Sequence, residues 1–133
     1  GFDKNAEVMH SMFSFGFGFV EIGTVTPKPQ NGNVKPRVFR LKEDLAIINN
    51  LGFNNKGMIK IKKNLQKFRN PKFNNQIIGV NIGKNKNTLD AVNDYLQVIE
   101  ELGSFASYIT INISSPNTED LRSFHDQTKL QNV

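Results

Sequence analysis

The sequence predicts an α/β protein whose strands pair in parallel. Three segments, 19–25, 77–82 and 108–113, are short and rich in β-branched or aromatic residues, as buried strands are. Strands joined through helices of roughly ten or more residues pair in parallel through right-handed crossovers. This pattern leaves two architectures open. One is an open doubly wound sheet, and the other is part of a (β/α) barrel, because a complete eight-stranded barrel needs about 250 residues.

The first part of the chain is predicted to contain a helix, a strand and an irregular excursion. Apolar residues recur on one side of segment 5–15, which predicts a helix, and the glycines that follow end it. Strand 19–25 comes next. A stretch rich in Pro, Gly and Asn covers 26–36, and the alternating residues of 37–41 predict a small hairpin or an edge strand.

The second part is predicted to alternate helices with the two remaining strands. In the Lys-rich segment 56–69, apolar residues recur at helical spacing and lysines fill the other positions. Thr88 is the predicted N-cap of the next helix, and Gly103 is expected to end it. A final helix is expected over residues 120–130.

Composition and charge exclude several classes of function. Lys and Arg exceed Asp and Glu by 17 − 12 = 5, and a basic protein raises the question of nucleic acid. The basic run 56–69 has no aromatic residue on its charged side to stack against a base, so we expect a solvated helix face and no nucleic-acid partner. The absence of cysteine excludes disulfides, thiolate metal sites and Cys nucleophiles, and two histidines are too few for a His-based metal site.

Polar side chains end all three predicted strands. The third strand alternates, so Thr110, Asn112 and Ser114 share one face, whereas a central parallel strand is normally apolar on both. Asn81 ends the second strand and Thr24 the first, and ligands bind at the carboxyl ends of strands in barrels and open sheets alike. Converging amides indicate a neutral, polar, planar ligand. The alternative is that the two asparagines bond only to loop backbone.

Other active-site motifs do not fit. The sequence Gly16-Phe17-Gly18 precedes a strand instead of following one, so it is not a dinucleotide-binding pattern. Ser115 lacks the flanking glycines of a nucleophile elbow, which disfavours a Ser-His-Asp hydrolase. The residues alone therefore indicate an α/β protein with a polar ligand site at its strand ends.

Five blocks of the sequence resemble a known family. In chain order they are GFDKN at 1–5, EIGTVTPKPQ at 21–30, NNLGFNN at 49–55, GVNIG at 79–83 and INISSPNT at 111–118. Together they resemble class 2, quinone-dependent dihydroorotate dehydrogenases, and the match runs from residue 1 to about residue 131.

The resemblance implies an FMN-dependent (β/α)₈ TIM barrel that oxidises dihydroorotate to orotate in pyrimidine (UMP) biosynthesis and passes the electrons to quinone. Residues 1–133 would be a partial FMN-binding barrel domain, about strands 2 to 4 with their helices, and residues 26–53 an excursion that carries a substrate-site loop. The parent protein would be peripheral on an inner membrane, bacterial cytoplasmic or mitochondrial, through N-terminal helices absent from these residues. The segment alone would then be inactive.

The resemblance also assigns site residues. Ser115 would be the base that removes the C5 proton of dihydroorotate while hydride leaves C6 for flavin N5, and Lys4 would pair with the substrate carboxylate. The other residues that would contact the substrate are Asn49, Asn50, Leu51, Gly52, Phe53, Asn112 and Asn117. Those that would contact FMN are Gly1, Thr24, Asn81 and Asn112. No metal site is expected.

Two further expectations concern the segment by itself. The N-terminus has neither an initiator Met nor a leader and no apolar run reaches the ~20 residues of a membrane helix, so the chain is expected to begin within a longer sequence and to lack a targeting or membrane segment. A different class of function stays open, namely a non-catalytic half-barrel or basic anion-binding module that self-associates through its open strand edges.

Overall fold

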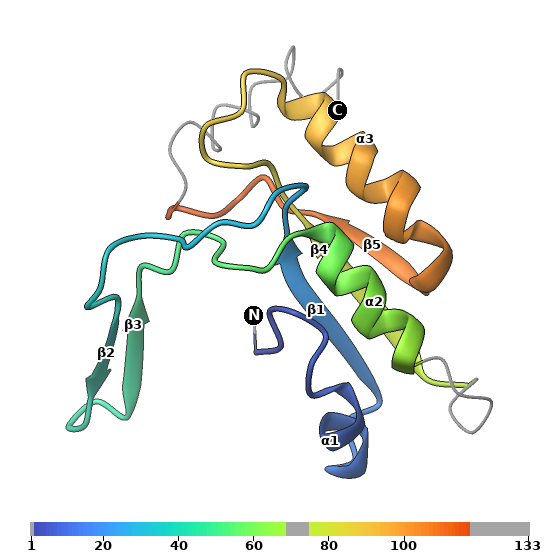
Figure 1. Cartoon of the computed structure of the whole chain (residues 1–133). Coiled ribbons are helices and arrows are strands. Elements are labelled where there is room, and N and C mark those ends of the chain that lie inside the picture. Colours follow the sequence, from blue (N-terminus) through green and yellow to red (C-terminus); the bar gives the residue numbers. More distant parts are fainter. Residues whose placement is uncertain (1, 69–74, 118–133) are drawn as a thin grey trace.

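The computed structural model describes residues 2–68 and 75–117 and shows a parallel sheet flanked by helices (Figure 1). The sheet has the strand order β1-β4-β5, and both of its pairings are parallel. The α/β fold and the parallel pairing predicted from the sequence are therefore confirmed. The elements are α1 (Met9–Ser14), β1 (Phe19–Val25), β2 (Val38–Leu41), β3 (Ala46–Asn49), α2 (Met58–Phe68), β4 (Ile77–Ile82), α3 (Ala91–Leu102), a 3-10 turn (Gly103–Phe105) and β5 (Tyr108–Ile111).

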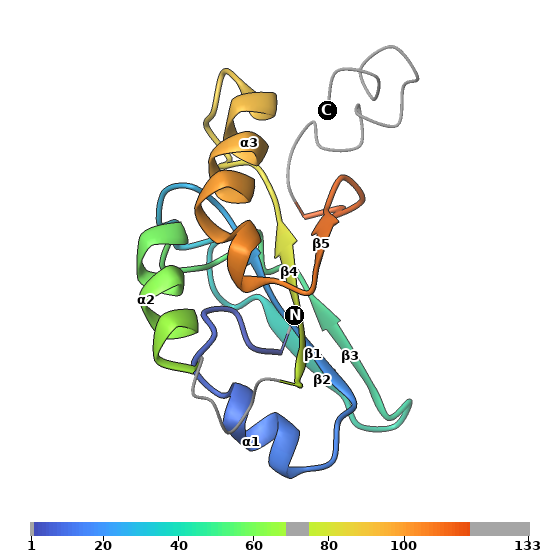
Figure 2. The same cartoon turned by 90° about the vertical axis from the view of Figure 1, so that its right-hand side faces the viewer.

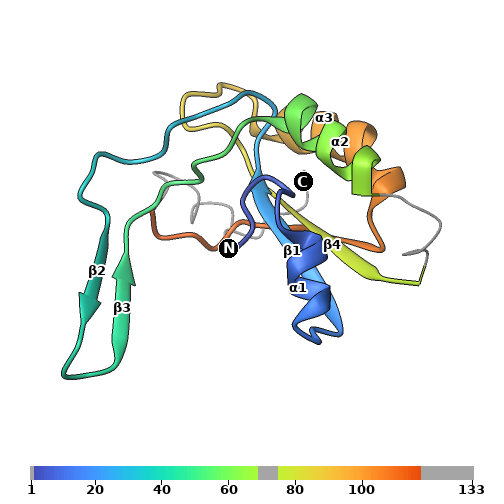
Figure 3. The same cartoon turned by 60° about the horizontal axis from the view of Figure 1, so that its bottom comes forward.

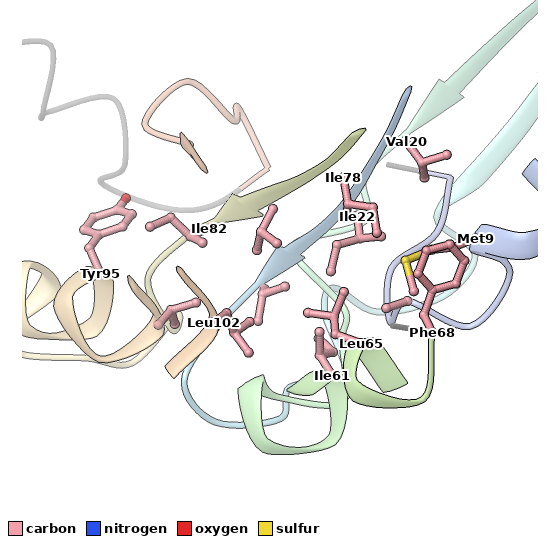
Figure 4. Close-up of a cluster of buried hydrophobic side chains, with 14 residues drawn as sticks. Met9, Val20, Ile22, Ile61, Leu65, Phe68, Ile78, Ile82, Tyr95 and Leu102 are labelled. Atoms are coloured by element: carbon pink, nitrogen blue, oxygen red, sulfur yellow. The ribbon is translucent and has the colours of Figure 1, made fainter. Parts of the chain in front are cut away.

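Helices α2 and α3 cover the same face of the sheet (Figure 2). The core lies between them and the strands, because successive strand side chains alternate between the two faces and the apolar ones point toward the helices. Figure 4 shows this cluster, with Tyr95 of α3 at one end and Met9 of α1 near Phe68 of α2 at the other. The opposite face of the sheet carries polar side chains, among them Glu21, Asn81 and Thr110.

Strands β2 and β3 form an antiparallel hairpin that extends away from the sheet (Figure 3). The hairpin predicted around 37–41 is thus confirmed. Its side chains are exposed although many are apolar; Leu45 at the turn is 95% exposed and Ile47 64%. The chain leaves and rejoins the sheet through loops on either side of the hairpin, and the returning loop, 50–57, reaches the strand ends.

Several predicted boundaries were wrong for identifiable reasons. The helix predicted over 5–15 is shortened to Met9–Ser14, because the Asp3 carboxylate accepts hydrogen bonds from the backbone N–H groups of Glu7 and Val8, both at 2.9 Å, and holds that segment as a loop. The N-cap of α3 is Asp90 and not Thr88, whose hydroxyl instead accepts from the Asp90 backbone N–H at 3.3 Å.

The third strand is also shorter than expected. It ends at Ile111 instead of residue 113. The predicted helix 120–130 lies outside the described residues. No helix in the described ranges is both long enough and apolar enough to cross a membrane.

Candidate functional site

The carboxyl ends of the three parallel strands border a cleft of about 370 Å³, a size within the range of small-molecule sites. The returning loop and the N-terminal segment complete its wall. The lining residues are Lys4, Gly23, Thr24, Asn49, Leu51, Gly52, Phe53, Asn81, Asn112, Ser115 and Asn117. Most site residues predicted from the sequence therefore meet in one place. Asn50 is not among the lining residues, and Gly1 lies outside the described residues.

The polar side chains at the strand ends bond to one another. Thr24 Oγ1 donates to Asn81 Oδ1 at 2.6 Å, and Asn112 Nδ2 donates to both Thr24 Oγ1 and Asn81 Oδ1 at 3.2 Å. The alternative left open above was that Asn81 and Asn112 bond only to loop backbone. Of their side-chain atoms, only Asn112 Oδ1 does so, by accepting from the Ser114 N–H at 3.3 Å. We refer to Thr24, Asn81 and Asn112 as the strand-end triad. It presents neutral donors and acceptors to the cleft.

Gly23 allows the triad to form. Its φ of +106° lies in the left-handed region, and a Cβ at this position would overlap the Asn81 carbonyl oxygen. The pairing of β1 with β4 shifts register between Gly23 and Val25, which places Thr24 beside Asn81. Gly23 was not predicted as a site residue, although it lies inside one of the quoted blocks.

The loop that carries Leu51, Gly52 and Phe53 is held by Asn55, which is 7% exposed. Asn55 Oδ1 accepts from the backbone N–H groups of Thr26 at 3.3 Å and Gly57 at 2.8 Å. Its Nδ2 donates to Thr26 Oγ1 and to the Phe53 carbonyl, both at 2.8 Å. These bonds stabilise Phe53 in an uncommon backbone conformation with φ of +53°.

Asparagines connect the hairpin end to the loop after β5. Asn117 Nδ2 donates to Asn49 Oδ1 at 3.3 Å, so two predicted substrate residues contact each other. Asn33 Nδ2 donates to the Asn117 carbonyl at 3.1 Å and to Asn50 Oδ1 at 2.8 Å. The side chain of Asn50 is therefore engaged with Asn33 and supports the wall of the cleft.

Lys4 brings positive charge to the cleft. The Gly23 N–H donates to the Asp3 carbonyl at 3.0 Å, which fixes the N-terminal segment beside the end of β1. Burial, and to a lesser extent the positive charge of Arg37, lower the pKa of Lys4. Within the described residues no carboxylate lies at ion-pair distance from Lys4. The cleft therefore favours an anionic group at this end.

Ser115 lies in the same cleft without a protein base beside it. Its Oγ accepts from the Asn117 backbone N–H at 3.3 Å. None of the described lining residues is Asp, Glu or His. A proton taken up by Ser115 would have to leave through water.

Comparison with known proteins shows the family of the chain. The family model for dihydroorotate dehydrogenase matches residues 1–133. The chain belongs to the dihydroorotate dehydrogenase family. Among its relatives, the dihydroorotate dehydrogenase (quinone) of Stenotrophomonas maltophilia is 49% identical over the whole chain, and that of Bartonella tribocorum is 53% identical over 98% of it.

Solved structures of the family share the fold. DHODH from Eimeria tenella, crystallised with ferulenol, matches with a TM-score of 0.92 and 47% identity over 99% of this chain. The ligand-free form of that protein gives the same TM-score. The chain spans 38% of the Stenotrophomonas relative and 36% of the ferulenol-bound structure. Its fold is therefore part of the family's (β/α) barrel, as the resemblance implied.

Proposed function

We propose that the complete protein oxidises dihydroorotate to orotate in pyrimidine (UMP) biosynthesis, with FMN as cofactor and quinone as electron acceptor. The observation that carries this proposal is the meeting of Lys4, Ser115 and the strand-end triad in one cleft. The names of the Stenotrophomonas and Bartonella relatives support both the substrate and the acceptor.

The substrate fits the charge pattern of the cleft. Dihydroorotate is a small ring with one carboxylate, and Lys4 is a cation without a carboxylate partner among the described residues. In the proposed complex, Lys4 binds the substrate carboxylate. The amides of Asn49, Asn112 and Asn117, together with the loop Leu51, Gly52 and Phe53, bind and orient the ring.

Ser115 is the proposed base for the C5 proton of the substrate. Because its Oγ accepts a backbone hydrogen bond from Asn117, the hydroxyl is held in position in the cleft. A serine is a weak base at its ordinary pKa, so the proton must pass onward to water as it is taken up. The loop after β5 places Ser115 in the cleft, and this placement accounts for much of its proposed contribution to the rate of proton removal.

The triad fits the polar edge of a flavin ring. Thr24, Asn81 and Asn112 offer donors and acceptors without a charge, and Gly1 is proposed to join them at the chain's N-terminus. FMN supplies a two-electron acceptor for the substrate. We propose that residues 1–133 form one partial FMN-binding domain with an excursion at 26–53, and that the phosphate is held elsewhere, since barrels commonly bind phosphate after strands seven and eight.

Partners outside the segment are also proposed. Quinones are membrane lipids, so the complete protein would be peripheral on an inner membrane, in contact through a segment beyond these residues. The isolated segment is proposed to self-associate, because among the described strands β1 pairs on one side only.

The test uses a complete barrel, by which we mean a full-length protein that carries these 133 residues. One example is the Stenotrophomonas relative with its matching segment replaced by this chain. We expect FMN-dependent oxidation of dihydroorotate with a soluble quinone, and no turnover with NAD or fumarate. Dihydrouracil, which lacks the carboxylate, serves as the control substrate and should not turn over. Equal oxidation of dihydrouracil would contradict the proposed substrate.

A further inference from the structure

A carboxylate lies directly behind the strand-end triad. Glu21 is in the middle of β1, on the sheet face that points away from the helices, and it is not part of the cleft lining. Its Oε1 accepts from Asn81 Nδ2 at 3.0 Å, and its Oε2 accepts from Thr110 Oγ1 at 2.8 Å. Glu21 therefore connects β1 with its neighbour β4 and, across β4, with β5.

Tyr108 packs against the same carboxylate. Gly79, the partner of Glu21 in the register, has no side chain, and a Cβ there would overlap the Tyr108 ring. The ring can therefore lie across β4 toward Glu21. Burial and, secondly, the negative charge of Glu21 raise the pKa of Tyr108. The phenol thus stays a neutral donor beside Glu21.

The carboxylate gives the hydrogen-bond network a direction. An ionised carboxylate can only accept hydrogen bonds, so Asn81 must turn its Nδ2 toward Glu21. The Asn81 Oδ1 then faces Thr24 and Asn112, both of which donate to it. A reversed Asn81 amide would place its NH₂ against the Asn112 NH₂, and neither group can accept.

This direction fixes what the cleft offers a ligand. An amide nitrogen carries two hydrogens, and Glu21 takes one from Asn81. Within the described residues nothing accepts the second, and Asn81 lines the cleft. Asn112 Nδ2 lies 3.2 Å from both Thr24 Oγ1 and Asn81 Oδ1, and because these two oxygens are only 2.6 Å apart, they can share one of its hydrogens. An N–H of Asn81 is therefore a free donor toward the cleft.

We propose that Glu21 is a positioning residue: by accepting from Asn81 it fixes the orientation of that amide, so that Asn81 donates to the flavin ring. The proposal rests on the function proposed above only in naming the ligand. Glu21 itself touches neither the ligand nor the reacting atoms. Its effect passes through Asn81, with Thr110 and Tyr108 holding the carboxylate in place.

Two substitutions separate the orientation of the Asn81 amide from the charge and the bulk of the Glu21 side chain. Glu21→Gln keeps an oxygen that accepts from Asn81 and gains an NH₂ that donates to the Thr110 hydroxyl, so FMN affinity should stay within about threefold of the parent complete barrel. Glu21→Leu keeps bulk but accepts nothing, and should raise the FMN Kd by about tenfold or more and shift the flavin absorption bands. Glu101→Leu, on α3 beside Lys62, is the matched control and should change neither the FMN Kd nor the flavin absorption bands.

A flavin-free measurement keeps this inference distinct from the proposed function. In the apo complete barrel, the side-chain NH₂ of Asn81 should give two well-resolved nitrogen-15 NMR cross-peaks in the parent and in Glu21→Gln. In Glu21→Leu these should broaden or move, while the backbone spectrum of the core is retained. This result would support the inference even if dihydroorotate were not oxidised.

Three outcomes would overturn the inference. If Glu21→Leu leaves both the FMN Kd and the Asn81 cross-peaks unchanged, Glu21 does not position the amide. If Glu21→Gln weakens FMN binding as much as Glu21→Leu does, the charge of Glu21 supports FMN binding and the orientation of the Asn81 amide does not. If Glu21→Leu changes only the unfolding midpoint and leaves the flavin spectrum of the folded protein as in the parent, its role is structural.

Discussion

At the scale of single residues, Lys4 makes substrate binding sensitive to pH. Its pKa is lowered by burial and by Arg37, and only the protonated form can pair with a carboxylate. We expect the KM for dihydroorotate to rise as pH increases through the lowered pKa. Lys4→Arg, which keeps its charge throughout, should remove this dependence, and Lys4→Ala should raise KM by about 10- to 100-fold at neutral pH. A pH profile of Lys4→Ala parallel to that of the parent would contradict the role.

The residue scale also shows what sequence could and could not predict. Alternation along β5 placed Asn112 on the polar face, and the structure confirms its position in the cleft. Glu21 was not predicted as part of the network, because a glutamate in a strand is ordinarily a solvent-facing residue and its partners are remote in sequence. Asn50 was grouped with its neighbours in one block, but in a loop adjacent side chains point in different directions.

At the scale of elements, α3 supports the strand-end triad from behind. Tyr95 is 1% exposed and its hydroxyl donates to the Asn112 carbonyl at 3.1 Å. Tyr95→Phe removes this bond and leaves the carbonyl with one partner fewer, so we expect a loss of about 1 kcal/mol in the free energy of unfolding, measured with urea on the complete barrel.

Alkaline pH gives an independent check on Tyr95. Burial raises its pKa to about 12, above the ordinary tyrosine value of 10.0. A phenol whose folded-state pKa is raised contributes stability that is present below the unfolded pKa and is lost as pH rises through the folded one. The contribution should thus disappear between about pH 10 and 12 in the parent and be absent from Tyr95→Phe. Identical stability profiles for the two proteins would contradict the burial of a neutral phenol.

The loop at the cleft depends on Asn55 in a comparable way. Asn55→Ala deprives several buried backbone and hydroxyl groups of their partner, and we expect unfolding to become easier by about 2–3 kcal/mol. The neighbouring Asn54 is a matched control, because its Oδ1 has no hydrogen-bond partner among the described residues. Asn54→Ala should lower the free energy of unfolding clearly less in the same urea titration. Equal losses in the two variants would contradict the stabilising role of the Asn55 hydrogen bonds.

The bounds of the strands and helices show how far sequence periodicity can predict secondary structure. Strands 19–25 and 77–82 were predicted with the observed bounds, since compact apolar runs identify buried strands. The first helix was predicted too long, because the capture of backbone N–H groups by Asp3 is a tertiary detail that an apolar stripe does not contain. Fold class was predictable because buried apolar strands separated by segments of helical length determine the parallel pairing.

At the scale of the whole molecule, the open edge of β1 is the surface that most favours association. Exposed aromatic side chains gather beside it, with Phe15 75%, Phe17 58% and Phe19 59% exposed. They line a hollow with Phe2 and Val20. Unpaired strand edges next to apolar surface favour association.

We therefore expect the 133-residue chain alone to associate as its concentration rises, as measured by sedimentation velocity. Phe17→Lys should weaken this association because it places a charge on the apolar edge. Leu89→Lys, at a fully exposed position near the start of α3, is the control and should leave it unchanged. A monomer at all concentrations would contradict the proposed self-association.

The most direct test of the proposed function is flavin reduction by dihydroorotate in a single anaerobic turnover of the complete barrel. We expect fast reduction in the parent and in the control Ser114→Ala, and reduction slower by about 10²- to 10⁴-fold in Ser115→Ala with FMN still bound. Unchanged reduction in Ser115→Ala would remove Ser115 from its role as base. No reduction in the FMN-loaded parent would contradict the proposed reaction as a whole.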